Sequence, residues 1–205
     1  MAKKPLFSLK AMHTQKTAKV VTPESHVKAS VALSINYLKS HTKKVQGLRN
    51  LIEGPPVPNQ IIFLSTVKSF NAFTFIPYIL KHHSVIDELY LSTFAINQRV
   101  LTSFAHLLRQ KALNKVSILA SESIIKRLPK VYHLLESYQK QYPQLQVRYA
   151  WNHSKVTLIR CGENYYCVEG SGNWSENAAI EQYLFTNSKE LFNFRQQIIS
   201  NAPTP

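Results

Sequence analysis

Short apolar runs alternate with longer amphipathic segments between residues 60 and 141, and this alternation limits the possible folds most strongly. "QIIFLST" (60–66) and "KVSILAS" (115–121) have the length and β-branched content of buried strands. "NQRVLTSFAHLLRQKAL" (97–113) has apolar residues at the spacing of an amphipathic helix. Strand–helix units in series predict an α/β domain, with a mixed β-sheet flanked by helices.

The rest of the chain continues this pattern. We expect further strands over 86–95, 145–151, 155–161, 165–172 and 181–188, and helices over 73–83, 123–143 and 189–200. Pro77 fits the first turn of its helix, whereas Pro129 should break the helix that contains it. The strands at 155–161 and 165–172 should form a hairpin that turns at Gly162-Glu163-Asn164.

Residues 1–55 differ from this domain. The first 20 or so residues are basic and polar without periodicity, whereas 23–52 shows helical spacing. The glycine and prolines of "EGPPVPN" (53–59) cannot continue a helix. We therefore expect a basic, partly helical N-terminal extension over 1–55 and a second domain over 56–205.

The charge of the chain favours a polyanionic partner. Lys and Arg number 25 against 11 Asp and Glu, which gives a net charge of +14 and a pI near 9.8. Lysines that neutralise phosphates release condensed counterions, so nucleic acid is the favoured partner, with Lys43 and Lys44 as candidate contacts. A general solubility charge, or attraction to a ribosome or membrane surface, would give the same excess.

The sequence predicts a cytoplasmic protein without a membrane partner. No window approaches 18 uninterrupted apolar residues, and Lys10 interrupts the segment that could have been a signal peptide. Cys161 and Cys167 flank the predicted hairpin turn, and two reduced thiols fit a cytosolic protein best. A disulfide across the hairpin is the alternative.

Polar residues with phosphate-binding chemistry cluster in and after this hairpin. His153 and Lys155, two apart on an expected strand, would share one face. The turn "GSGN" (170–173) follows, and its glycines would allow close backbone approach to a ligand, with N–H groups facing an anion. "SEN" (175–177) resembles a helix start, which would favour an anion further. Because the chain has no carboxylate cluster and no Cys/His set, we expect a phosphate site without metal or cofactor.

"HSK" followed by "GSGN" resembles the HKD motif of the phospholipase D superfamily. The similarity is to the small single-motif bacterial nucleases of that family, and it continues through Glu181 and "FRQQII" (194–199). It covers about residues 57–205 and implies an α-β-α sandwich. H-x-K alone is weak, since His26 and His41 also begin such triplets, but neither is followed by G-S-x-N.

The resemblance implies roles for five residues. His153 would form a phosphohistidine, while Lys155 and Asn173 would hold the non-bridging oxygens with help from Ser171. Glu181 would orient His153 by accepting from its other ring nitrogen. One departure is Arg160, which stands where the family has Asp; strand alternation places this position on the face opposite Lys155.

The family's active site takes two such motifs, and this chain has one convincing copy. A twofold homodimer would bring His153 of both chains to one phosphate; the alternative is that His26 or His41 completes the site within one chain. Trp151 and Trp174 flank the motif, and either stack on bases or pack in the core.

These features favour a metal-independent phosphodiesterase or endonuclease that cleaves nucleic acid, with DNA favoured over RNA. A catalytically silent, phospholipase D-like DNA-binding module is the first alternative, and Arg160 would be consistent with it. The second is a phosphatidyl transferase acting on phospholipids, which would normally require two motifs and membrane contacts.

Overall fold

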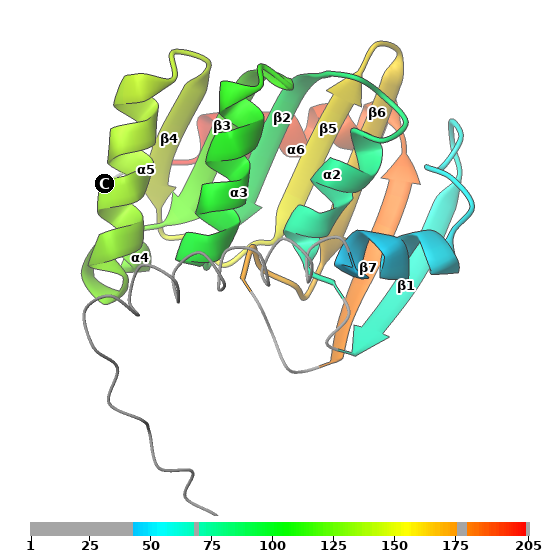
Figure 1. Ribbon diagram of the computed structural model, residues 1–205, viewed down its shortest axis with the longest axis horizontal. Coiled ribbons are helices and arrows are strands. Elements are labelled where there is room, and N and C mark those ends of the chain that lie inside the picture. The colour runs from blue at the N-terminus through cyan, green and yellow to red at the C-terminus, as the bar shows by residue number, and fades with distance from the viewer. Residues whose placement is uncertain (1–42, 68–69, 176–179, 204–205) are drawn as a thin grey trace, which may run out of the picture. The chain divides into compact units, whose positions relative to one another are not determined.

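A seven-stranded mixed sheet forms the centre of the protein (Figure 1). The computed structural model describes residues 43–67, 70–175 and 180–203, which belong to one compact unit. The sheet order is β1-β7-β6-β5-β2-β3-β4. The strands are β1 (Ile61–Val67), β2 (Ile86–Thr93), β3 (Leu113–Ser121), β4 (Leu145–Ala150), β5 (Val156–Cys161), β6 (Asn164–Gly170) and β7 (Ile180–Asn187). Strands β2, β3 and β4 are parallel, and the other pairs are antiparallel, which confirms the predicted mixed sheet.

Helices cover both faces of the sheet. The helical elements are η1 (Ala72–Thr74), α2 (Phe75–Ile79), α3 (Gln98–Arg109), α4 (Ser123–Arg127), α5 (Pro129–Gln141) and α6 (Lys189–Asn201). Figure 1 shows α2, α3 and α5 in front of the sheet and α6 behind it. The connections β2–α3–β3 and β3–α5–β4 both join neighbouring parallel strands and proceed in the same direction along the sheet. Because such connections are right-handed, α3 and α5 lie on the same face.

Local signals explain where these helices begin. The Asn97 side chain accepts from the Val100 N–H at 2.8 Å and caps α3. Pro129 occupies the first turn of α5, where its missing N–H costs no hydrogen bond. The break predicted at this proline is the boundary between α4 and α5. Ser188 caps α6 by accepting from the Leu191 N–H at 3.3 Å.

The larger core lies under the front helices, and a smaller core under α6. Residues 43–51 are helical, and Val45, Leu48 and Ile52 are buried in the larger core. The hydrophobic core therefore includes residues N-terminal to the domain start expected at residue 56. The part of the predicted helix before residue 43 lies outside the described residues.

The two cysteines lie on opposite faces of the sheet. Cys161 belongs to the larger core and Cys167 to the smaller one, and their hairpin partners are Asn164 and Leu158, respectively. Both thiols are free, as predicted. Side chains directed to opposite faces cannot form a disulfide, so the alternative of a cross-hairpin bridge is wrong.

Among the described residues, no helix combines the length and apolar character that spanning a membrane requires.

Candidate active site

One edge of the sheet brings the sequence-predicted residues together. The carboxyl ends of β2, β3, β4 and β6 meet there with the amino ends of β5 and β7, because β5 and β7 run antiparallel to their neighbours. In register, Val156 of β5 pairs with both Ser92 of β2 and Glu169 of β6. The segment before β5 and the turn after β6 are therefore neighbours. Ligands of open α/β sheets bind at such carboxyl edges.

His153 and Lys155 lie in the connection before β5. The strand begins at Val156, so the prediction that both side chains project from one strand face is wrong. The Lys155 ammonium donates to the His153 carbonyl oxygen at 3.0 Å and lies 3.5 Å from the ring Nδ1. The second contact is at the limit for a hydrogen bond and does not fix which ring nitrogen carries the proton. His153 is exposed, so its ring is accessible to a substrate.

The Phe94 ring contacts His153, Lys155 and Arg127. Its ring centroid is 4.6 Å from that of His153, 5.9 Å from the Lys155 Nζ and 5.8 Å from the Arg127 Cζ. Cations at this distance from an aromatic ring are attracted to its negative face. Neither Phe94 nor Arg127 is indicated by the motif spacing; the signal in the sequence for Phe94 is an aromatic residue directly after a buried strand.

The end of β2 also orients Asn173. Its side-chain oxygen accepts from the Ala95 N–H at 3.2 Å and from the Thr93 hydroxyl at 3.4 Å. Because a backbone N–H can only donate, the amide oxygen must face it. The Nδ2 group of Asn173 is therefore the part left to donate to a ligand, which suits the predicted contact with a phosphate oxygen.

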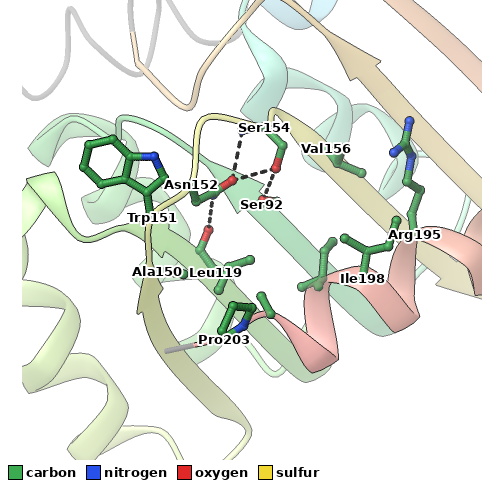
Figure 2. Close-up of a pocket in the computed structure, with 12 residues that line it drawn as sticks. Ser92, Leu119, Ala150, Trp151, Asn152, Ser154, Val156, Arg195, Ile198 and Pro203 are labelled. Atoms are coloured by element: carbon green, nitrogen blue, oxygen red, sulfur yellow. Dashed lines mark hydrogen bonds between the residues drawn. The ribbon is translucent and has the colours of Figure 1, made fainter. Parts of the chain in front are cut away.

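Asn152, also missed from the sequence, attaches the His153 segment to the same strand ends. Its amide nitrogen donates to the carbonyl oxygens of Thr93 (3.3 Å) and Leu119 (3.1 Å). Its oxygen accepts from the Ser154 N–H at 2.9 Å and from the Ser154 hydroxyl at 2.7 Å, as Figure 2 shows. Residues 93–95 thus contact both halves of the motif, through Asn152 and Asn173.

The glycines of the 170–173 turn allow close approach to β7 rather than to a ligand. A Cβ atom at Gly170 would lie 2.0 Å from the Gln182 carbonyl oxygen, and one at Gly172 would lie 1.9 Å from the Tyr183 hydroxyl. The N–H of Ser171 donates to the Gln182 carbonyl at 3.1 Å, so it does not face an anion as expected. Residues 176–177 of the expected helix start lie outside the described residues.

Glu181 is buried beneath this turn. The Ser171 hydroxyl donates to its carboxylate and accepts from the Gln182 N–H at 3.0 Å. Burial and the Glu181 charge raise the pKa of the neighbouring Tyr183. Glu181 therefore contacts the turn through Ser171, and its predicted role in orienting His153 stays a prediction.

The two tryptophans have different environments. Trp174 is 0 % exposed, packs against Phe73 and Phe104 with centroids 5.1 and 5.6 Å away, and donates to the Thr157 hydroxyl at 3.2 Å. The prediction that Trp174 contacts bases is wrong, because the side chain belongs to the core. Trp151 is 91 % exposed, so its indole is accessible.

Arg160 lies at the other end of β5, paired in register with Glu88. Its Nε donates to the Glu88 carboxylate at 2.8 Å, and its Nη1 lies 3.8 Å from Asp87. Arg160 thus belongs to an ion-pair cluster outside the candidate site. At the start of the described chain, Lys43 is exposed and Lys44 partly exposed, and their contact with nucleic acid stays a prediction.

The described residues contain no group of three or more His, Cys, Asp or Glu arranged to hold a metal ion.

Comparison with known proteins shows the fold. No protein-family model and no curated protein sequence matches the chain. Solved structures do match: polyphosphate kinase from Porphyromonas gingivalis, with TM-score 0.51 and 17 % identity, over 71 % of this chain and 27 % of that one. Phosphatidylserine synthase from Haemophilus influenzae matches with TM-score 0.51 and 14 % identity, over 71 % of this chain and 40 % of that one.

The chain thus spans about a quarter of the first protein and two fifths of the second. Both belong to the phospholipase D superfamily. Together with the seven-stranded mixed sheet between helices, these matches show that this chain has a phospholipase D-like α/β fold.

Proposed function

We propose that this protein is a metal-independent phosphodiesterase that cleaves nucleic acid, DNA in preference to RNA, through a phosphohistidine intermediate in the cytoplasm. The observation that carries the proposal is the junction at residues 93–95, where Phe94 contacts His153 and Thr93 and Ala95 hold Asn173. The candidate nucleophile His153 and the hydrogen-bond donor Asn173 thereby lie at the same end of the sheet. The superfamily fold supports chemistry at a phosphate ester, but at these identities it does not choose the substrate.

The residues support a two-step reaction. A His153 nitrogen attacks phosphorus while the bond to the leaving oxygen breaks, and a second histidine gives that oxygen its proton. Water then attacks the phosphohistidine, the second histidine takes a proton from it, and the P–N bond breaks. Lys155 and Asn173 stabilise the charge on the non-bridging oxygens, where preorganised donors contribute most. The single hydroxyl proton of Ser171 goes to Glu181, so Ser171 holds the turn that carries Asn173 rather than donating to the phosphate.

The second histidine comes from another copy of the chain. Among described residues, the H-x-K…G-S-x-N pattern occurs once, and His26 and His41 lie outside the described residues. Because a twofold axis brings identical residues together, a homodimer with its axis near His153 would supply both histidines to one phosphate. His153 is exposed at the sheet edge, as such an arrangement requires.

The charge supports nucleic acid as the substrate. The net charge of +14 favours a polymer with many phosphates, because each neutralised phosphate contributes counterion release. The exposed Trp151 provides a surface on which an unpaired base could stack. A phospholipid is the rival substrate, since a phosphatidylserine synthase has the same fold.

The test is cleavage in excess EDTA. Purified protein is incubated with plasmid, with single-stranded oligonucleotide and, separately, with phosphatidylglycerol vesicles. We expect DNA cleavage without metal, and a loss of at least about 100-fold in His153→Ala, the lower end of what a positioned acid–base group contributes. His133→Ala, which changes an exposed histidine on α5, is the matched control and should cleave normally.

Cleavage that requires added metal would refute this mechanism. DNA binding without cleavage would support the silent binding module instead, and turnover of lipid alone would support the phosphatidyl transferase. The shared site has its own test, in which wild type and His153→Ala are mixed in equal amounts and allowed to exchange subunits. If both histidines of a dimer are needed, activity per total protein falls to about a quarter rather than half.

A further inference from the structure

A small cavity lies behind the His153 segment, between the sheet edge and the C-terminal part of α6 (Figure 2). Its volume is about 230 Å³. Leu119, Val156, Ile198 and Pro203 contribute apolar walls, and Trp151, Asn152 and Ser154 come from the loop that carries His153. Sites for drug-sized ligands occupy about 300–1,000 Å³, so this cavity fits a single ring system rather than a whole ligand.

The cavity does not have the charge of a phosphate site. Its one cationic lining residue, Arg195, donates through Nε and Nη2 to the two carboxylate oxygens of Glu169, each at 2.6 Å. A bidentate pair of this kind neutralises the guanidinium and uses its planar fork. The charge of Arg195 is therefore offset by Glu169, which lies outside the lining, in contrast to the cations around Phe94.

Hydroxyl groups give the cavity a polar side. Ser92 and Ser154 are joined by a hydrogen bond of 2.5 Å between their Oγ atoms, and the Ser154 hydroxyl also contacts the Asn152 oxygen at 2.7 Å. A hydroxyl oxygen has two acceptor positions, so at least one serine oxygen retains capacity to accept from a ligand N–H. A fatty acyl chain would leave this capacity unused, whereas a heteroaromatic ring that bears N–H groups would use it.

Trp151 connects the cavity to the reaction site. It lines the cavity, is 91 % exposed, and stands two residues before His153. We propose that the cavity and Trp151 form a subsite for one unpaired nucleobase of the substrate, next to the phosphate held at His153 and Lys155. The inference rests on the proposed nuclease function and adds that the substrate strand must be single or locally unpaired, because a base within a duplex cannot enter a pocket.

Fluorescence of Trp151 tests the subsite without requiring cleavage. The chain has two tryptophans, and because Trp174 is buried, Trp151 is the one that a bound base can quench. The His153→Ala variant, which leaves DNA intact, is titrated with a single-stranded oligonucleotide, with an abasic strand of the same length and charge, and with the duplex. We expect saturable quenching by the single strand, and at least about fivefold weaker binding without quenching for the other two, which is the lower range for one stacked base.

Two further changes, both made in the His153→Ala protein, locate the effect. Ala202→Phe fills the cavity and should reduce affinity for the single strand to that for the abasic strand, whereas Gln197→Phe on an exposed position of α6 should not. Trp151→Ala, at a side chain too exposed to affect folding, should remove the same preference as judged by anisotropy of a labelled strand. Equal binding of abasic and normal strands, or a preference that survives Trp151→Ala, would overturn the subsite.

The proposed function and the subsite can fail separately. EDTA-resistant cleavage with equal binding of abasic and normal strands would retain the nuclease and reject the subsite. Single-strand quenching by a protein that never cleaves would retain the subsite and reject catalysis. A blue shift of Trp151 emission on anionic vesicles, without quenching by DNA, would assign the cavity to lipid and overturn the inference.

Discussion

The polar groups at the two ends of β5 differ in how many hydrogen bonds they make within the protein. Before the strand, the Lys155 ammonium has one hydrogen bond of 3.0 Å, to a carbonyl oxygen, and a marginal contact of 3.5 Å to His153. At the other end, Glu88 accepts from Arg160 at 2.8 Å, from Tyr90 at 2.6 Å and from Lys115 at 3.2 Å. Groups whose hydrogen bonds are complete stabilise the fold, whereas donors with unused capacity can bind a ligand. We therefore expect mutations at one end to affect activity, and at the other to affect stability.

The largest effect is expected at Lys155. In Lys155→Ala, loss of one charged donor to the phosphate should lower kcat for DNA cleavage by about 100- to 1,000-fold, the range measured for a single donor to a transition-state oxyanion. The melting temperature should stay unchanged, because the hydrogen bond that is lost is exposed. Single-turnover cleavage in EDTA and a thermal melt measure the two quantities.

Lys130→Ala, an exposed lysine at the start of α5, is the matched control and should cleave normally. If Lys155→Ala lost stability instead of activity, the difference between the two ends of β5 would disappear.

The next effect concerns Gly172, whose missing Cβ allows contact with Tyr183. Gly172→Ala places a methyl group 1.9 Å from the Tyr183 hydroxyl and 2.6 Å from its Cζ. Overpacking of this kind typically costs about 1–3 kcal/mol in unfolding free energy, and the turn that carries Ser171 and Asn173 should shift. Chemical denaturation measures the stability change.

Tyr183→Phe removes the hydroxyl, the atom of closest contact, which has no hydrogen-bond partner among the described residues. The double variant Gly172→Ala/Tyr183→Phe should therefore recover part of the lost stability. Absence of any recovery would show that the contact with Tyr183 is not what requires glycine at this position.

The elements of the fold could be predicted because periodicity is a local property. The strand β3 is buried on both faces from Val116 to Ser121, and Pro129 separates α4 from α5 as expected. Residues that are neighbours only across the sheet could not be predicted in the same way. Residues 93–95 lie next to the motif because β2 pairs with β5, about 60 residues later in the chain.

Motif spacing identified His153, Lys155, Ser171 and Asn173, but not what holds them. The glycines of the turn were assigned to ligand approach, whereas they accommodate β7. The sequence leaves base stacking and core packing open for Trp174, and the structure places its side chain in the core. Sequence shows which residue types are near one another along the chain, and only packing distinguishes those that face solvent.

A smaller effect is expected at Arg160. Burial raises the pKa of Glu88, but hydrogen bonds from Tyr90, Lys115 and Arg160 outweigh it and leave the pKa below its usual value. Arg160→Ala should lower the unfolding free energy at neutral pH by about 1 kcal/mol, the upper end for a partly exposed ion pair, and the melting temperature by about 2–4 °C. Cleavage should be unaffected. Loss of activity with unchanged stability would show that Arg160 acts in the reaction site.

This stabilisation should depend on pH. Because the folded pKa of Glu88 is lowered, its contribution is present above the unfolded pKa of about 4.3 and is lost as pH falls through the folded value. The stability difference between wild type and Arg160→Ala should therefore diminish below about pH 4. A difference that stays constant down to pH 2 would mean that Glu88 is not the group responsible.

The smallest effect is expected at the cysteines, of which Cys161 ends β5 next to Arg160 and Cys167 lies within β6. Burial raises the pKa of both Cys161 and Cys167 to about 12, so at pH 8 only about one thiol in ten thousand is ionised in the folded protein. Because the thiolate is the reactive form, iodoacetamide should label neither cysteine in an hour at pH 8, but both after unfolding in guanidinium chloride. Mass spectrometry distinguishes the products. Labelling of Cys161 alone in the folded protein would show that the Arg160 end of β5 opens, whereas the well-paired cluster there should keep it closed.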